Sequence, residues 1–141
     1  MPIEIAPAVT DADILDCFDV MALLRPHLTR EGFVDRVRTQ MAGGYQMAAL
    51  RDEGSVRAVA GYRLLHQLAY GKTLYVDDLV TAESDRSKGY GNDLFDWLVE
   101  QGGALGMDEL QLDSGVQRFA AHRFYFRKRM YIHAYHFRLA L

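Results

Sequence analysis

Two glycines behind an arginine mark the stretch of this sequence best suited to bind a phosphate. The segment 85–97 reads DRSKGYGNDLFDW. Arg86, Gly89 and Gly91 come first, and the amphipathic run after them predicts a helix. Helix N-termini present unpaired backbone N–H groups and the positive end of the helix dipole, so anions bind there. Glycines at these positions, in front of a helix, are thus consistent with a cradle for phosphate. A flexible strand-to-helix turn is the simpler interpretation of the same glycines.

The spacing of these glycines excludes two other phosphate-binding motifs. A Walker loop ends in Gly-Lys-Ser/Thr after a fixed spacing, and no such ending occurs here. A dinucleotide fingerprint needs a third glycine and a position after the first strand of a βαβ series, and both are missing. The segment therefore indicates a phosphate site of another type.

A second candidate lies about thirty residues further on, in the segment 117–131, which reads QRFAAHRFYFRKRMY. At 3.6 residues per turn, Arg118, His122 and Arg129 fall on the same helix face as Tyr125. The tyrosine is thus expected on a cationic stripe that suits an anionic ligand. The alternative is an amphipathic aromatic side chain at the end of a buried helix.

The pattern of the whole chain predicts one α/β domain over residues 1–141 with a mixed central sheet. Thr10 and Thr29 are the expected N-caps of helices over 10–26 and 29–43. The first half contains antiparallel hairpins, whereas strands alternate with helices in the second half, which indicates parallel crossovers. The remaining helices are expected over 89–103 and 116–128, and strands over 2–8, 45–52, 56–69, 73–81, 108–114 and 130–141.

In these residues the chain resembles the GNAT superfamily of acyl-CoA-dependent N-acetyltransferases. LYVDDLVT at 74–81 is similar to the fourth strand of that family, RSKGYG at 86–91 to its pyrophosphate loop, and AHRFYFRKRMY at 121–131 to its catalytic tyrosine helix. The resemblance follows the element order of the whole chain and is tightest over 73–131. It implies a single-domain GNAT-like α/β fold, in which about four helices flank the sheet and splayed parallel strands bind acyl-CoA.

The resemblance also implies which residues bind acetyl-CoA as co-substrate and which act in catalysis. Tyr125 matches the tyrosine that gives a proton to the departing thiolate. The pantetheine is expected to pair with the main chain at Leu79, Val80 and Thr81, in the manner of an added strand. The expected contacts to the phosphates and nucleotide are Arg86, Ser87, Lys88, Gly89, Tyr90, Gly91, Arg118 and His122.

Acetyl transfer to an amine also needs a base, because an alkylamine is protonated at neutral pH. Asp77 and Asp78 are adjacent, so in a regular strand they point to opposite faces. Asp78 is favoured because it shares a face with Val76 and Val80, whereas a bulge would reverse the choice. Glu83 is the remaining candidate for the base. The alternative, non-catalytic explanation of the two aspartates is that each caps the strand end or forms a salt bridge.

Composition and charge narrow the possible compartment and binding partners of the protein. The single Cys17 excludes an internal disulfide framework, and the N-terminus lacks the pattern of a secretory signal, so a cytoplasmic protein is expected. No apolar run is long enough to predict a membrane span, and the histidines have no spacing typical of a metal site. Residues 1–114 hold nineteen acids and ten bases, a net charge of −9, and the rest holds six bases and no acid. The acidic majority argues against nucleic acid as the partner of the basic tail.

The expected function is acetyl transfer from acetyl-CoA to a small amine or a peptide by direct attack in a ternary complex, without a metal. A non-catalytic acyl-CoA-binding sensor or partner-binding domain is the alternative. The chain departs from the family pattern in two places: Arg129-Met130 replaces Gly-Phe after the tyrosine helix, and Arg118 replaces an asparagine. The short C-terminus leaves room for one long strand, and a homodimer that completes the sheet stays open.

Overall fold

The computed structural model describes residues 3–82 and 88–141, and the chain divides into two compact units at residues 111 and 112. The first unit contains a sheet and four helices of the described chain, and the second contains one helix. The elements follow in the order β1 (Ile3–Pro7), α1 (Asp11–Asp16), α2 (Phe18–Leu24), α3 (Arg30–Ala42), β2 (Tyr45–Asp52), β3 (Ser55–Gln67), β4 (Gly71–Thr81), α4 (Tyr90–Ala104), β5 (Glu109–Leu112) and α5 (Phe119–Arg127).

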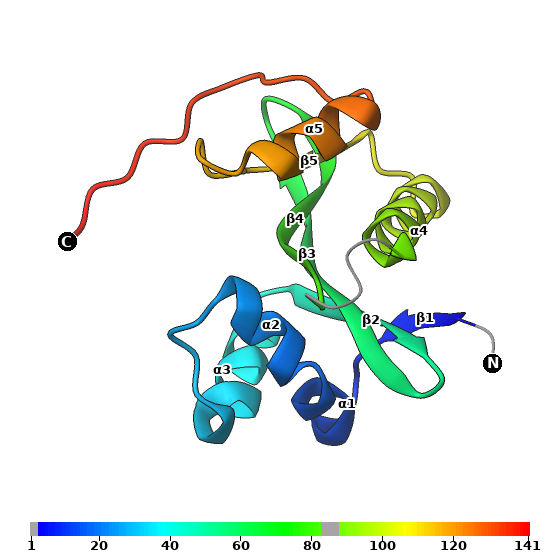
Figure 1. The fold of residues 1–141 in the computed structure, drawn as a ribbon. Helices are drawn as coiled ribbons and strands as arrows, with labels where there is room; N and C mark the ends of the chain where they lie inside the picture. The colour runs from blue at the N-terminus through cyan, green and yellow to red at the C-terminus, as the bar shows by residue number, and fades with distance from the viewer. Residues whose placement is uncertain (1–2, 83–87) are drawn as a thin grey trace. The chain divides into compact units, whose positions relative to one another are not determined.

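The strands form one sheet in the order β1-β2-β3-β4-β5, which confirms the expected mixed α/β architecture. The first four strands are joined as antiparallel neighbours, whereas the chain passes from β4 to β5 through α4, the connection that a parallel pair requires. Helices α1 to α3 lie on one face of the sheet and α4 lies on the other (Figure 1). The sheet is therefore covered on both faces.

Local sequence signals account for where the helices of the first unit begin. The Thr10 hydroxyl accepts a hydrogen bond from the Asp13 amide at 3.1 Å, and the Thr29 hydroxyl accepts one from the Gly32 amide at 3.2 Å. Both caps were expected, and each stabilises its helix by about 1 kcal/mol. The expectation of one continuous helix over 10–26 is wrong. At Cys17 the backbone amide donates to the Ile14 carbonyl, three residues back instead of four, so α1 ends there and α2 begins as a separate helix.

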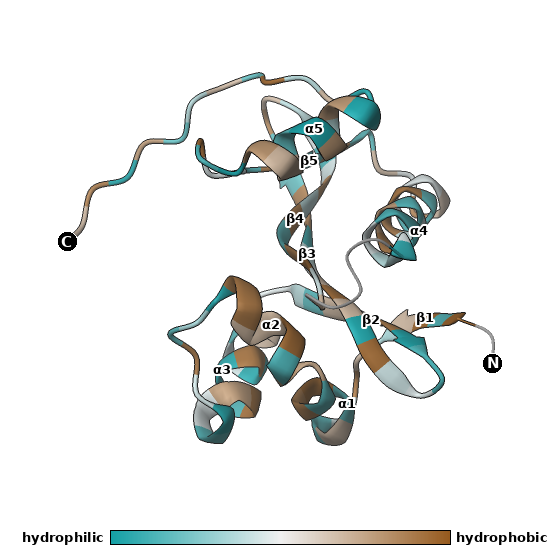
Figure 2. Ribbon diagram, viewed as in Figure 1, coloured by the Kyte–Doolittle hydropathy of each residue, from teal (hydrophilic) through white to brown (hydrophobic). Residues whose placement is uncertain are grey.

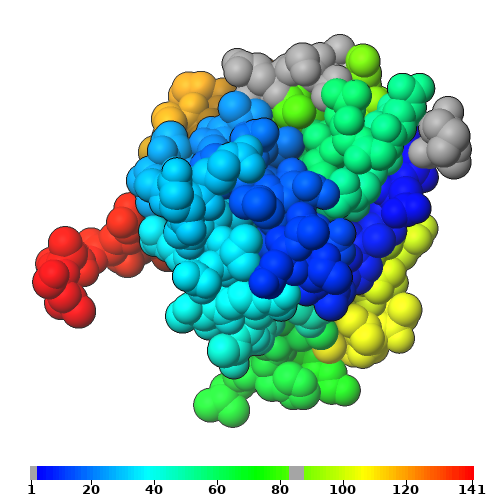
Figure 3. Space-filling view, turned by 90° about the horizontal axis from the view of Figure 1, so that it is seen from below, coloured from blue at the N-terminus to red at the C-terminus, as the bar shows by residue number. Residues whose placement is uncertain are grey.

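The main core fills the space between β2, β3 and the helices α1 to α3. Phe33 of α3 is buried and packs edge to face against Phe18 of α2, with ring centroids 5.3 Å apart. Figure 2 shows the apolar segments along β2 and α2 in brown, and Figure 3 shows α1 to α3, coloured blue to cyan, as one layer over this face of the sheet. The largest side chains fully buried in this cluster are Ile14, Cys17, Phe33, Met47 and Val59.

The C-terminal segment differs from its expected structure. Residues 130–141 form no strand, so the strand expected there is wrong, although Tyr131, Tyr135 and Phe137 alternate as a strand would require. An isolated strand lacks the neighbour that satisfies its backbone hydrogen bonds, and residues 130–141 have none in the sheet of the described chain. These aromatic side chains are 78–90% exposed. Within residues 3–82 and 88–141, no helix combines the length and the apolar character needed to span a bilayer.

Candidate active site

A β-bulge near the middle of β4 sets the positions of the two candidate bases. Asp78 pairs with Gly61 of β3, but the next pair is Val76 with Tyr62, so Asp77 is an extra residue in β4. Regular alternation of side chains fails at such a residue. Asp77 and Asp78 accordingly both line the same cavity, which a regular strand would not allow. The choice between them depends on their partners.

Asp78 is held by two donors from other elements. Arg25, just after α2, donates from Nε to Oδ1 at 2.9 Å, and Tyr45 of β2 donates from its hydroxyl to Oδ2 at 2.7 Å. Only 12% of the Asp78 side chain is exposed. Burial and the negative charge of Asp78 both raise the pKa of Tyr45, so its hydroxyl keeps its proton and remains a donor. Oδ1 lies 2.9 Å from both Nε and Nη2 of Arg25, whereas Oδ2 accepts the Tyr45 hydroxyl and has a second lone pair that a water or an amine can use.

A glycine in β3 allows Tyr45 to reach across the sheet. Gly61 lies on the strand between Tyr45 and Asp78, and a Cβ built at this position would overlap the Tyr45 ring. Glycine inside a strand often marks such a close approach. Sequence reasoning missed Tyr45 and Arg25, and Gly61 was the one signal that could have indicated the crossing.

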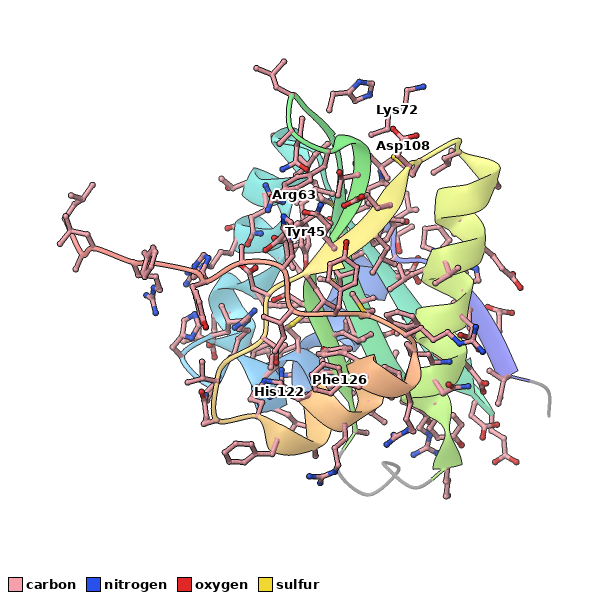
Figure 4. All side chains as sticks on the ribbon, turned by 90° about the horizontal axis from the view of Figure 1, so that it is seen from above. Tyr45, Arg63, Lys72, Asp108, His122 and Phe126 are labelled. Atoms are coloured by element: carbon pink, nitrogen blue, oxygen red, sulfur yellow. The ribbon has the colours of Figure 1, made fainter. Side chains whose placement is uncertain are left out.

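Asp77 is engaged differently. Arg63 of β3 donates from Nε and Nη2 to its two oxygens, both at 2.8 Å, which is a bidentate ion pair. The Arg63 guanidinium also lies 5.2 Å from the centre of the Tyr75 ring. Figure 4 labels Arg63 and Tyr45, which hold the two aspartates. Because both oxygens of Asp77 are held by one cation, Asp78 is the better placed of the two to exchange a proton.

The two aspartates line a cavity of about 370 Å³ between α2, α3 and the strands β2 and β4, a size typical of a small-molecule site. Its walls combine apolar side chains from the core with polar groups. The apolar lining consists of Met21, Leu28, Phe33, Val37 and Met47. The polar lining consists of Arg25, His27, Arg36, Gln40, Asp77 and Asp78, together with Tyr45.

The start of α4 has the geometry expected of the phosphate loop in the part that the structure describes. Gly89 is the N-cap of α4 with φ +81°, and a Cβ built on it would meet no atom within 4 Å. Among the described residues no side chain caps this end of the helix, and helix-start amides are groups that can bind an anion. At Gly91, a Cβ would lie 2.9 Å from the Thr81 hydroxyl oxygen, so any other residue would force Thr81 or the helix start to shift.

The other residues expected in this loop differ in their exposure, and some lie outside the described residues. Lys88 is exposed, whereas Tyr90 is buried and its hydroxyl donates to Asp52, which leaves only its backbone to face a ligand. Arg86 and Ser87, and the alternative base Glu83, lie outside the described residues.

The end of β4 offers the backbone edge expected for pantetheine. Leu79, Val80 and Thr81 pair with Ala60, Val59 and Ala58 of β3, and β5 adjoins β4 on its other side. β5 begins beside Lys72, where the Asp108 amide donates to the Lys72 carbonyl at 2.7 Å and Asp108 Oδ2 accepts from the Lys72 amide at 2.9 Å (Figure 4). Because β5 has four residues and β4 has eleven, β4 runs on beyond its end.

The second unit carries the tyrosine. Tyr125 lies in α5 and is partly buried, and this burial raises the pKa of its hydroxyl, with the positive charge of Arg118 opposing the rise. His122 bonds through Nε2 to the Gly115 carbonyl at 2.8 Å. The expected helical stripe of Arg118, His122, Tyr125 and Arg129 is wrong at both ends. Arg118 precedes the first residue of α5, and Arg129 follows the last one with φ +66°. Arg118 nevertheless stays close enough to influence the tyrosine.

The histidines near the C-terminus have no common structural role. The expected strand that would have placed His133 and His136 on opposite faces is absent, and His136 forms an ion pair with Asp113 at 3.0 Å. Residues 3–82 and 88–141 contain no group of three histidine, cysteine, aspartate or glutamate side chains arranged to hold a metal ion.

The covered sheet, the bulged β4 and the glycine-initiated α4 agree with the expected GNAT-like α/β fold, and comparison with known proteins identifies the family. Residues 15–130 match the Acetyltransferase (GNAT) family, and the chain belongs to it. It is 34% identical over 111 residues, 78% of each chain, to an uncharacterised N-acetyltransferase, YhdJ, of Bacillus subtilis (strain 168).

Two solved structures have the same fold at low identity. One is a ribosomal-protein-alanine N-acetyltransferase from Brucella melitensis biovar Abortus 2308, with a TM-score of 0.83 and 14% identity over 99% of this chain and 100% of that one. The other is glucosamine-6-phosphate N-acetyltransferase from Arabidopsis thaliana, with a TM-score of 0.78 and 18% identity over 99% of each chain. The names of these two proteins point to different acceptors, so the shared fold does not determine the acceptor.

Proposed function

We propose that this protein transfers the acetyl group of acetyl-CoA to a primary amine by direct attack in a ternary complex. Membership of the family establishes acyl transfer in general, and the acetyl donor and the amine acceptor go beyond it. The observation that carries the proposal is Asp78, a carboxylate fixed by Arg25 and Tyr45 on the wall of a small-molecule cavity. The similarity to a protein named as an N-acetyltransferase supports nitrogen as the attacking atom.

The residues of α4 and β4 fit the proposed donor. The backbone amides that start at Gly89 would bind its pyrophosphate, and the open space in front of Gly89 leaves room for the approach. The main chain of Leu79 to Thr81 would pair with the pantetheine, and Arg118 and His122 would add positive charge. Bound there, acetyl-CoA supplies the thioester whose carbonyl carbon accepts the amine. Roles for Arg86, Ser87 and Lys88 remain predictions from the family resemblance.

Asp78 and Tyr125 would move the protons. Asp78 accepts a proton from the ammonium form of the acceptor, directly or through a water, so that the nitrogen lone pair becomes free. The new C–N bond forms as the C–S bond breaks, and Tyr125 donates its proton to the departing sulfur. The proton that the nitrogen then loses restores the Tyr125 hydroxyl. The raised pKa of Tyr125 supports this role, because the hydroxyl enters the reaction protonated.

Cys17 supports direct attack over a covalent relay. It is the only cysteine of the chain, it is fully buried, and burial raises the pKa of its thiol to about 12. A thiol that keeps its proton at neutral pH is a poor nucleophile. The acetyl group would therefore pass from sulfur to nitrogen in one transfer.

We further propose that both units form one acetyltransferase domain over residues 1–141. The match to the family runs from residue 15 to 130 and so crosses the boundary between the units at residue 111. A single family match that includes both units supports one domain.

The test is the release of free CoA thiol from acetyl-CoA with a panel of amines, using the variants Asp78→Asn and Asp77→Asn. Loss of the base should lower the turnover of Asp78→Asn by about 100- to 10,000-fold, with the affinity for acetyl-CoA unchanged. A larger loss in Asp77→Asn would move the base to the other aspartate. Binding of acetyl-CoA by the wild type without turnover of any amine would favour the non-catalytic sensor.

A further inference from the structure

The charges that line the cavity are not balanced once their partners are counted. Asp78 is held by Arg25 and Tyr45, and Asp77 is held by the bidentate pair with Arg63. Arg25 is itself satisfied, since it bonds to the Asp78 carboxylate and, from Nη2, to the Asp77 carbonyl at 3.0 Å. Each acid of the cavity therefore already has a cation of the protein as its ion-pair partner.

Arg36 is the cation that remains. It lies on α3 and lines the cavity, but it makes no hydrogen bond or ion pair to any part of the chain that the structure describes. The neighbouring arginines behave differently, because Arg25, Arg30 and Arg38 each form an ion pair with an aspartate at 2.7–2.9 Å. The free guanidinium at the cavity is thus an exception within its own helical layer.

The groups beside Arg36 are also hydrogen-bond donors. Gln40 lies one turn further along α3 on the same face, and His27 lines the cavity from the segment before α3. A guanidinium presents five N–H groups in a planar fork that matches the oxygens of a carboxylate or a phosphate. The complement of this part of the cavity is an anionic oxygen group.

We propose that the acceptor is a small amine that also carries a carboxylate or a phosphate, and that Arg36 binds this group. The inference rests on the proposed function, because the amine of the same molecule would face Asp78. Side chains such as Phe33 and Met47 line the cavity as well and suit a short hydrocarbon segment between the two charged ends. The volume of about 370 Å³ fits a molecule of metabolite size.

The experiment compares matched acceptors that differ only in charge: amino acids against their methyl esters, and aminoalkyl phosphates against the corresponding amino alcohols. The wild type is expected to acetylate the anionic member of at least one pair with the higher kcat/KM. Arg36→Gln should raise KM for that acceptor by about 10- to 100-fold, the effect of a lost charge-assisted hydrogen bond, with kcat nearly unchanged. Arg36→Lys should recover part of the loss, because it restores the charge without the planar fork.

Arg38→Gln is the control, since Arg38 lies on the same helix but pairs with Asp11 outside the cavity. It should leave KM of the anionic acceptor unchanged, and thermal melting of each variant checks that the fold is retained. The proposal is overturned if the wild type prefers the neutral member of every pair, or if Arg36→Gln affects both members equally. Either result leaves the proposed acetyltransferase intact, whereas acetylation of no amine at all contradicts both.

Discussion

Replacing Gly89 by alanine tests whether the start of α4 binds the donor phosphates. Gly89 has φ +81°, a left-handed conformation that costs an alanine about 1–2 kcal/mol. For a chain of this length, that cost lowers the melting temperature by about 3–8 °C. The new methyl group would meet no atom of the described residues within 4 Å, so it would take up open space at the start of the helix, where the phosphates are proposed to bind. Loss of one charge-assisted hydrogen bond to a phosphate would weaken acetyl-CoA binding by about 10- to 100-fold.

The chain offers a matched control at Gly54. Gly54 lies in the turn between β2 and β3 with the same φ of +81°, and a Cβ built there also meets nothing within 4 Å. Gly54→Ala should therefore lose a similar amount of stability and bind acetyl-CoA as the wild type does. Melting temperatures measured without ligand, and dissociation constants measured by calorimetry, separate the two effects. Equal acetyl-CoA affinity in the two variants would refute the phosphate site at α4.

The remaining predictions concern the two sides of the proton transfer. Gly61→Ala should destabilise the fold by about 1–3 kcal/mol and lower turnover, because its methyl group would displace the Tyr45 ring from Asp78. In a Tyr45→Ala background the same change should cost much less, and additive free energies of unfolding in that double-mutant cycle would contradict the crossing. Tyr125→Phe should lower turnover by about 10- to 1000-fold without weakening acetyl-CoA binding. Because burial raises the pKa of Tyr125, wild-type turnover should fall on the alkaline side only above about pH 10, and a fall near neutral pH with unchanged turnover in the Phe variant would exclude the proton donor.

The features predictable from the sequence are those fixed by nearby residues. Thr10 and Thr29 cap their helices through amides three residues away, and Gly89 begins α4 in the left-handed conformation that glycine favours. The strands β2, β3 and β4 appear close to their expected bounds because runs rich in apolar residues lie between turns that contain Gly44, Gly54 and Gly71. These features depend on residues close in the sequence and do not require a particular partner strand.

The features missed by the sequence depend on contacts between distant residues. Asp78 meets Tyr45 across 33 positions and Arg25 across 53, and the bulge at Asp77 exists only through the pairing of β4 with β3. The expected strand over 130–141 failed for the same reason, because alternation supplies a strand pattern but not the neighbouring strand. The free charge of Arg36 became visible only when the ion pairs of its neighbours were known.

The most direct test of the proposed function is to incubate the wild-type protein with isotope-labelled acetyl-CoA and amine acceptors, and to measure both products together. Direct transfer in a ternary complex predicts free CoA thiol and an N-acetylated acceptor in equal amounts, with thiol release that depends on the amine. Thiol release without an acetylated amine would mean hydrolysis rather than transfer. Label on Cys17 or on any other side chain as an intermediate would contradict direct attack, and binding of acetyl-CoA with no release at all would contradict the enzyme itself.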